Sequence, residues 1–255
     1  KHAVLMVLRN LPDVLRIFLV PYLLIGATFG LFAYLTGIWQ YFEYGKTVQI
    51  QGELLPAGFG FFFILAMLLI SVLNLWGVTA WHRYVLLEEY PRGWVPAFRT
   101  DRIFAYFLRL LQIMLIGMLC FLPALLIIIF VIPILSGVGG LNPLIFSIIW
   151  FACVAVIAVV VTQISPILPA AAIGRPLQIS EAWEKTKGSG WSILVVVVLY
   201  FVFQLALTYL VGISAQVFMP LGIAFNILVF LLLPMVTISL LTTFYGHYVE
   251  GREIG

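Results

Sequence analysis

The sequence predicts an all-α integral membrane protein with six transmembrane helices and short cytoplasmic interfacial helices. Hydrophobic residues make up 64% of the chain and charged residues 9%, and the mean hydropathy is +1.18. Between Arg109 and Arg175, 65 residues pass without a Lys, Arg, Asp, Glu or His. A run of that length suffices for two membrane crossings of about 20 residues each. Leu122–Leu135 and Leu194–Phe203 are apolar on every side, which favours helices over the alternating strands of a barrel.

The apolar stretches predict one membrane domain over residues 1–255. The six spans are expected at about residues 16–36, 57–81, 103–135, 144–167, 191–219 and 221–245. The third is long enough to be tilted. A Gly/Pro-rich turn, Ser136–Pro143, joins the third and fourth spans. Met219–Leu221 joins the last two so tightly that they must form an antiparallel hairpin.

The basic residues predict the orientation of these spans. Of the 13 Lys and Arg residues, 12 fall in segments on one side of the membrane, and only Lys46 faces the other side. Basic residues collect on the cytoplasmic side of membrane proteins, so both termini are expected in the cytoplasm. An even number of spans likewise requires both termini to lie on the same side of the membrane.

Short amphipathic segments precede each pair of spans. In the clearest, Ser180–Lys187, Ser180 is expected to cap the helix and Gly188 to end it. Val95–Arg102 and Ala3–Leu15 are the other two. The sequence therefore suggests three repeated units, each an interfacial helix followed by two spans.

Basic side chains at the cytoplasmic border are candidates for contact with anionic lipid headgroups. Arg109 is the only charge clearly inside an apolar segment. We expect it to reach the headgroup level or to bind a lipid phosphate there, with a substrate-binding role as the alternative. The full candidate set is Arg99, Arg102, Arg109, Arg175, Lys185 and Lys187.

Small and uncharged polar residues within the spans are candidates for helix packing. Gly26 and Gly30 form a GxxxG pattern, which serves either a homodimer or packing within one chain. The full packing set is Gly26, Gly30, Asn74, Gln163, Gln204 and Asn226. A polar translocation path built from Gln112, Gln163, Gln204 and Asn226 is the alternative.

No motif predicts catalysis, a cofactor or a metal site. Cys120 and Cys153 fall inside apolar runs, away from any Cys/His cluster. His2, His82 and His247 are far apart in the sequence and lie at predicted membrane borders. We therefore expect no enzymatic activity, no catalytic residues and no cofactor. The modest excess of basic residues suits anionic lipid rather than a nucleic acid.

The segment after the fourth span carries a further pattern. A span ends in a proline, a short helix with a basic end follows, and an aromatic residue opens the next span. These features are Pro166 or Pro169, Ser180-Glu-Ala-Trp183, Lys185–Gly188 and Trp191. This layout resembles the YciC-like group of bacterial six-span membrane proteins and the membrane domain of some glycerophosphodiester phosphodiesterases. The resemblance implies a bacterial inner membrane and no intrinsic reaction, because the phosphodiesterase catalytic domain has no counterpart in this sequence.

These observations favour a non-enzymatic inner-membrane protein that acts through lateral contacts. It is expected to be an accessory, assembly or lipid-organising partner of a larger membrane complex. Its expected partners are anionic lipids on the cytoplasmic side and other membrane protein subunits. One alternative is a transporter or channel for a small or lipid-like substrate. Another is a membrane anchor for a catalytic domain outside this sequence.

Overall fold

The computed structural model describes residues 2–38, 58–126, 129–130 and 143–253. This part of the chain is helical and contains no strand. It includes six helices that are long and apolar enough to cross a membrane, so the predicted six-span all-α class is confirmed. The elements are α1 (His2–Arg9), α2 (Leu11–Leu35), α4 (Phe59–Leu87), α5 (Thr100–Leu126), α7 (Pro143–Ile164), α8 (Ile167–Ile173), α9 (Ile179–Thr186), α10 (Gly190–Val217), α11 (Met219–Phe244) and a π-helical turn, η2 (Tyr245–Val249).

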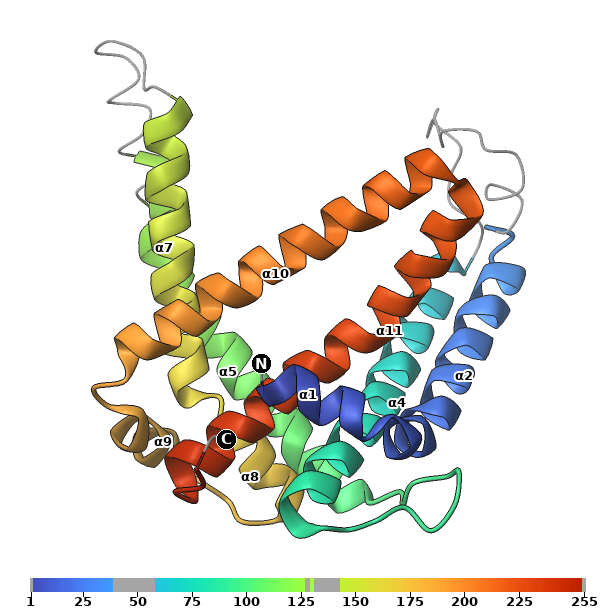
Figure 1. Cartoon of the computed structure of the whole chain (residues 1–255), viewed down its shortest axis with the longest axis horizontal. Helices are drawn as coiled ribbons and strands as arrows, with labels where there is room; N and C mark the ends of the chain where they lie inside the picture. Colours follow the sequence, from blue (N-terminus) through green and yellow to red (C-terminus); the bar gives the residue numbers. More distant parts are fainter. Residues whose placement is uncertain (1, 39–57, 127–128, 131–142, 254–255) are drawn as a thin grey trace.

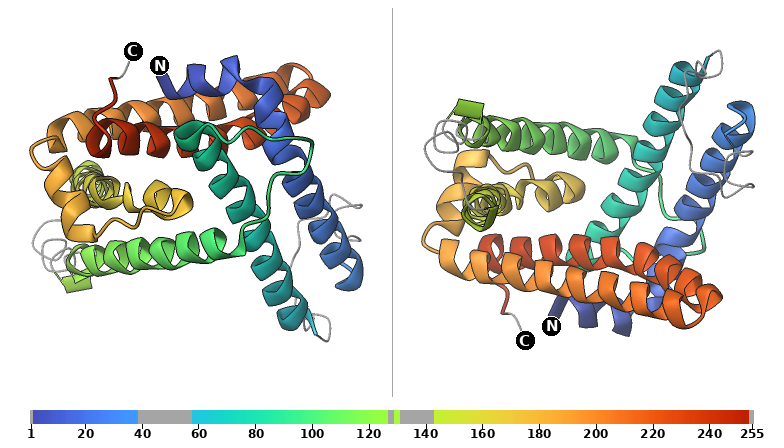
Figure 2. Two further views of the ribbon diagram at one scale, coloured as in Figure 1. Left: turned by 90° about the horizontal axis from the view of Figure 1, so that it is seen from below. Right: turned by 90° about the horizontal axis from the view of Figure 1, so that it is seen from above.

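The long helices converge at one end of the molecule. Helices α1, α8 and α9 gather there with residues 88–99 and the C-terminal segment, in the lower part of Figure 1. We call this the basal end. Helix α2 packs along α4, and α10 runs obliquely from α7 to the turn into α11. Views along the bundle show α8 inside a ring formed by α4, α5 and α11 (Figure 2), all of which it contacts.

The N-terminal interfacial helix is shorter than the predicted Ala3–Leu15. Helix α1 ends at Arg9, and α2 begins at Leu11 with a proline in its first turn. Asn10 lies between them and donates its Nδ2 to the Met6 carbonyl at 2.7 Å. Helix α1 packs against α11. The first span therefore starts about one turn earlier than expected.

The predicted interfacial helix at Val95–Arg102 is wrong. Residues 88–99 have no helix, and α5 begins only at Thr100. Pro96 disfavours helical geometry at Val95, and the tertiary contacts of Phe98 with Trp76 and of Arg99 with Glu89 accompany the later start of the helix. Of the three expected units, only the first and third therefore have their short helix.

The most important unexpected element is α8. The fourth span was expected to end near residue 167, but the chain breaks at Ser165 and Pro166 and then forms a further helix. All seven residues of α8 are buried. Three consecutive alanines, 170–172, allow neighbouring helices to approach closely. Helix α8 thus forms the centre of the apolar core at the basal end.

Helix α9 lies where a short interfacial helix was expected, but its cap differs. Gln178, rather than Ser180, is the N-cap, and its backbone N–H donates to Glu181 Oε2 at 2.8 Å. The expected stop at Gly188 is confirmed by its φ of 84°. The predicted turn Ser136–Pro143 and Lys46 fall wholly or mainly outside the described residues.

Candidate lipid-headgroup site

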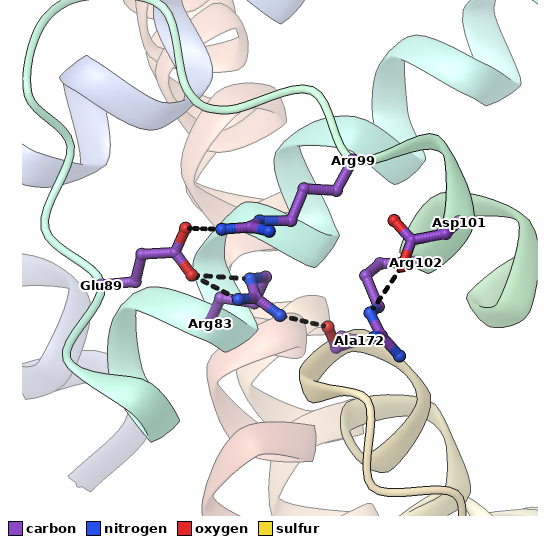
Figure 3. Close-up of polar contacts among 6 residues, drawn as sticks. All are labelled: Arg83, Glu89, Arg99, Asp101, Arg102 and Ala172. Atoms are coloured by element: carbon purple, nitrogen blue, oxygen red, sulfur yellow. Dashed lines mark hydrogen bonds and ion pairs between the residues drawn. The ribbon is translucent and has the colours of Figure 1, made fainter.

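Two arginines at the basal end share one carboxylate (Figure 3). Arg83, near the end of α4, donates its Nε to Glu89 Oε2 at 2.8 Å, and Arg99 donates its Nη2 to Glu89 Oε1 at 2.9 Å. The left-handed Glu88, with a φ of 55°, ends α4 and turns the chain so that Glu89 faces back toward Arg83. Arg83 also donates to the Ala172 carbonyl at 3.2 Å, which ties α4 to α8.

Glu89 is held in its charged form by this arrangement. Partial burial raises the pKa of its carboxyl group, but hydrogen bonds and charge from Arg99 and Arg83 outweigh burial, and the pKa falls below its ordinary value. Since the carboxylate stays ionised, it offsets much of the charge of both arginines. Arg99 is therefore less available to an outside anion than the sequence suggested.

A cavity of about 610 Å³ adjoins this network. Its charged lining residues are Arg83, Glu88, Glu89, Arg92 and Arg99. Three positive and two negative groups leave only a small net charge, so the cavity has little electrostatic preference for anions.

A second groove brings together two residues of the predicted headgroup set. It has a volume of about 450 Å³ and lies between α5 and the turn that follows α8. Arg102 and Arg109 line it from α5, together with Gln112. Seven residues separate the arginines, about two helical turns, so both face the same side of α5. We call this the Arg102–Arg109 groove.

The two arginines differ in how their charge is balanced. Arg102 Nε lies 2.9 Å from Asp101 Oδ2, and the Asp101 side chain is 65% exposed. Arg109 donates to the neutral Gln112 Oε1 at 2.8 Å. Within the described ranges, no carboxylate lies within ion-pair distance of Arg109. No described carboxylate therefore compensates its positive charge.

The other predicted headgroup residues lie away from the groove. Arg175 pairs with Glu250 at 3.2 Å, and Lys187 pairs with Glu184 at 3.4 Å. Lys185 donates to the Val249 carbonyl at 3.4 Å. These contacts hold the C-terminal segment and α9 rather than forming an anion site.

Sequence reasoning missed Arg252 as a structural residue. Its Nη2 donates to the Leu86 carbonyl at 3.2 Å, and its Nε lies 2.7 Å from Glu250 Oε2. Arg252 therefore fastens the C-terminal segment to the end of α4. Its position near the end of the sequence gave no signal of this contact.

His82 was expected at a membrane border, but it is fully buried. Its Nδ1 lies 2.8 Å from Thr242 Oγ1, its Nε2 lies 3.4 Å from Tyr106 Oη, and its ring stacks on Tyr106. The neighbouring Trp81 donates its Nε1 to Ser239 Oγ at 3.1 Å. These bonds join α4, α5 and α11. Ser239 and Thr242 are three residues apart on α11 and therefore lie on the same face of the helix. This spacing is the sequence signal that could have indicated a polar contact between helices.

The predicted GxxxG pair makes no close helix contact with the residues that the structure describes. A Cβ added at Gly26 or Gly30 would meet no atom within 4 Å. Close contact occurs at Gly77 instead, where a Cβ would lie 2.8 Å from Phe18 Cδ1. Gly222 is also tightly packed, because a Cβ there would overlap the Ala215 backbone. Glycine spacing alone did not identify the packed positions.

The polar residues of the spans do not converge on one path. Gln163 contacts α9, where Thr186 Oγ1 donates to its carbonyl at 3.2 Å. Asn74 donates to the Ile70 carbonyl of its own helix. Gln112 lies in the Arg102–Arg109 groove, whereas Gln204 and Asn226 line a separate groove between α10 and α11. The four residues of the predicted translocation path thus lie in three places.

In the part of the chain that the structure describes, no cluster of His, Cys, Asp or Glu side chains could hold a metal ion. Cys120 and Cys153 are free thiols. Comparisons of the chain with protein-family models, with curated proteins and with solved structures found no match.

Proposed function

We propose that this chain is a non-enzymatic membrane protein that binds anionic phospholipid at its basal end and acts as an accessory or lipid-organising partner of other membrane proteins. In this proposal it resides in a bacterial inner membrane with the basal end toward the cytoplasm. The observation that carries the proposal is the uncompensated charge of Arg109 in the Arg102–Arg109 groove.

The position of Arg109 along α5 favours a lipid phosphate as its partner. It lies nine residues after Thr100, which is about 13 Å along the helix. A guanidinium at that depth is costly in hydrocarbon unless it reaches the headgroup level or meets an anion. The groove lets its side chain run toward the basal end, where Arg102 supplies a second guanidinium.

The groove also suits the shape of a phosphodiester. Arginine binds phosphate oxygens with paired N–H donors. Gln112 Oε1 accepts from Arg109 at 2.8 Å, which leaves the amide N–H groups of Gln112 free to donate to a headgroup. Apolar residues beside the arginines, Ala105 and Leu108, offer a surface to the acyl chains.

Thermal unfolding in lipid nanodiscs tests this proposal. Wild-type protein is expected to unfold at a higher temperature in phosphatidylglycerol than in phosphatidylcholine, because a ligand that binds only the folded state stabilises it. The variant Arg102→Gln/Arg109→Gln is expected to lose most of this difference. Lys185→Gln/Lys187→Gln is the control, since it removes the same charge outside the groove and should keep the difference. Equal losses in both variants would contradict a defined site and indicate general charge attraction.

A further inference from the structure

Another groove, separate from the Arg102–Arg109 groove, lies between α10 and α11. It has a volume of about 540 Å³ and is lined by both apolar and polar side chains. Its polar members are Tyr200 and Gln204 on α10 and Asn226 and Thr237 on α11. We call it the carboxamide groove, after Gln204 and Asn226.

The carboxamide groove lies at membrane depth. Gln204 stands at the middle of α10, about 20 Å along the helix from either end. Its Nε2 donates to Tyr200 Oη at 3.2 Å, and the Tyr200 hydroxyl contacts Thr237 Oγ1. Gln204 Oε1 accepts no hydrogen bond from any described residue, and lipid at this depth offers no donor.

Asn226 has an even greater unmet capacity for hydrogen bonds. Its side chain is exposed on α11, seven residues after the helix begins, and forms no hydrogen bond within the described residues. Asn74 is the informative comparison, because it is also an exposed asparagine in a span but donates to the Ile70 carbonyl at 3.0 Å. Exposure alone therefore does not leave an asparagine without a partner.

The backbone adds another acceptor to the same groove. Pro234 lies inside α11 and has no N–H to donate to the carbonyl of Phe230, one turn earlier. Both residues line the groove. Asn226, Gln204 and Phe230 therefore bring hydrogen-bonding groups without a described partner to the residues that line one groove.

We propose that the carboxamide groove is a self-association surface, on which a second copy of this chain docks with its own α10 and α11. The two Asn226 side chains pair across a two-fold axis that runs along the membrane normal. The membrane fixes the orientation of every copy, so such an axis always brings Asn226 to the depth of its counterpart. A carboxamide both donates and accepts, so two of them satisfy each other.

The burial of the helices supports this choice of occupant. Only 6% of the most apolar stretch of α10 is buried within the chain, against 28% for α4. Among the described spans, α10 thus has the smallest buried share in its most apolar stretch. Polar side chains in lipid commonly join helices in this way. A phospholipid would leave Gln204 Oε1 unpaired, because its phosphate and ester groups lie at the interface rather than beside the middle of α10.

Self-association in bilayers tests the proposal. Copies labelled with donor and acceptor dyes, reconstituted in phosphatidylcholine over a range of protein-to-lipid ratios, are expected to show a saturating, dimer-type energy transfer. Asn226→Leu is expected to weaken dimerisation roughly tenfold. Asn226→Gln should restore much of it. Asn74→Leu is the control and should leave it unchanged.

A cross-link gives a second, independent measurement. In a chain with Cys120→Ala and Cys153→Ala, the further change Asn226→Cys is expected to form a disulfide-linked dimer in the membrane, whereas Asn74→Cys is not. The proposal is overturned if wild-type protein stays monomeric at every ratio, with or without retained lipid. It is also overturned if Asn226→Cys links only to a different protein in native membranes. Neither result bears on the Arg102–Arg109 groove, because phosphatidylcholine is used throughout.

Discussion

The guanidinium of Arg102 lies directly against Gly174, so closely that a Cβ at Gly174 would overlap it. Gly174 ends α8 with a φ of 78°, a backbone conformation that residues other than glycine rarely adopt. This contact joins the first turn of α5 to the end of α8. It also aims Arg102 into the groove that Arg109 lines.

Replacing this glycine should damage both stability and the groove. Gly174→Ala is expected to cost about 2–4 kcal/mol, because it adds backbone strain and displaces Arg102. Gly188→Ala is a matched control: its φ is 84°, but a Cβ there meets nothing within 4 Å, so only the strain of roughly 1 kcal/mol applies. Chemical unfolding in detergent measures the two costs. Equal losses would show that the contact with Arg102 contributes nothing.

Removing the buried histidine should loosen the joint between α4, α5 and α11. His82→Ala is expected to destabilise the protein by about 2–5 kcal/mol, because it leaves a cavity and removes the partner of Thr242. Thr242→Val should cost less, about 1–2 kcal/mol, since it keeps the volume but removes the hydrogen bonds of Thr242 Oγ1 to His82 Nδ1 and to the Ile238 carbonyl. Tryptophan fluorescence, recorded during unfolding, measures the free energy of unfolding of both variants. A His82→Ala variant as stable as Thr242→Val would contradict this description of the joint.

The glycine that packs should be distinguishable from the glycine that only fits a pattern. Gly77→Ala is expected to cost about 1–3 kcal/mol, because the buried Phe18 ring, which lies between Tyr22 and Trp81, must move. Gly26→Ala should be neutral or stabilise by up to ~1 kcal/mol, since it raises helix propensity in open space. Thermal unfolding of both variants in one detergent decides this. A larger loss of stability in Gly26→Ala than in Gly77→Ala would instead identify the GxxxG pattern as the packing site.

Acid should weaken the attachment of residues 88–99. The pKa of Glu89 lies below its ordinary value of 4.5 in the folded protein, so its contribution to stability is fully present above that value. It is lost as the pH falls through the lowered folded pKa, where the carboxylate takes up a proton. In Glu89→Gln this portion of the pH dependence should vanish. Unfolding curves measured between pH 3 and about pH 6 for both proteins give the comparison. If the free energy of unfolding of Glu89→Gln falls with pH as steeply as that of wild type, the proposed role of Glu89 is refuted.

Local features of the sequence were enough to predict the fold class. Hydropathy and length define membrane spans because lipid requires each apolar helix to satisfy its own backbone. Another local feature, the tolerance of glycine for a left-handed backbone conformation, predicted that α9 would stop at Gly188. The expected helix at residues 95–102 begins only at Thr100. Pro96 disfavours helical geometry at Val95, whereas Phe98 and Arg99 make tertiary contacts that an amphipathic pattern does not reveal.

Contacts between distant segments could not be predicted in this way. Arg102 and Gly174 are far apart in the sequence, and α8 appeared to be only the end of a span. The burial of His82 depends on Tyr106 and Thr242, which lie on two other helices. The candidate headgroup set contained Arg102 and Arg109, but only tertiary structure separates them from Arg99 and Arg175, whose charges Glu89 and Glu250 offset.

The central claim, that the Arg102–Arg109 groove holds an anionic phospholipid, is tested most directly by native mass spectrometry of protein released from mixed bilayers. Wild-type protein is expected to retain phosphatidylglycerol in preference to phosphatidylcholine. Arg109→Gln should lower this preference roughly tenfold, because a charged hydrogen bond to phosphate is lost. Lys187→Gln should leave it intact. Retention of phosphatidylglycerol that is the same in wild type and Arg109→Gln would contradict the claim.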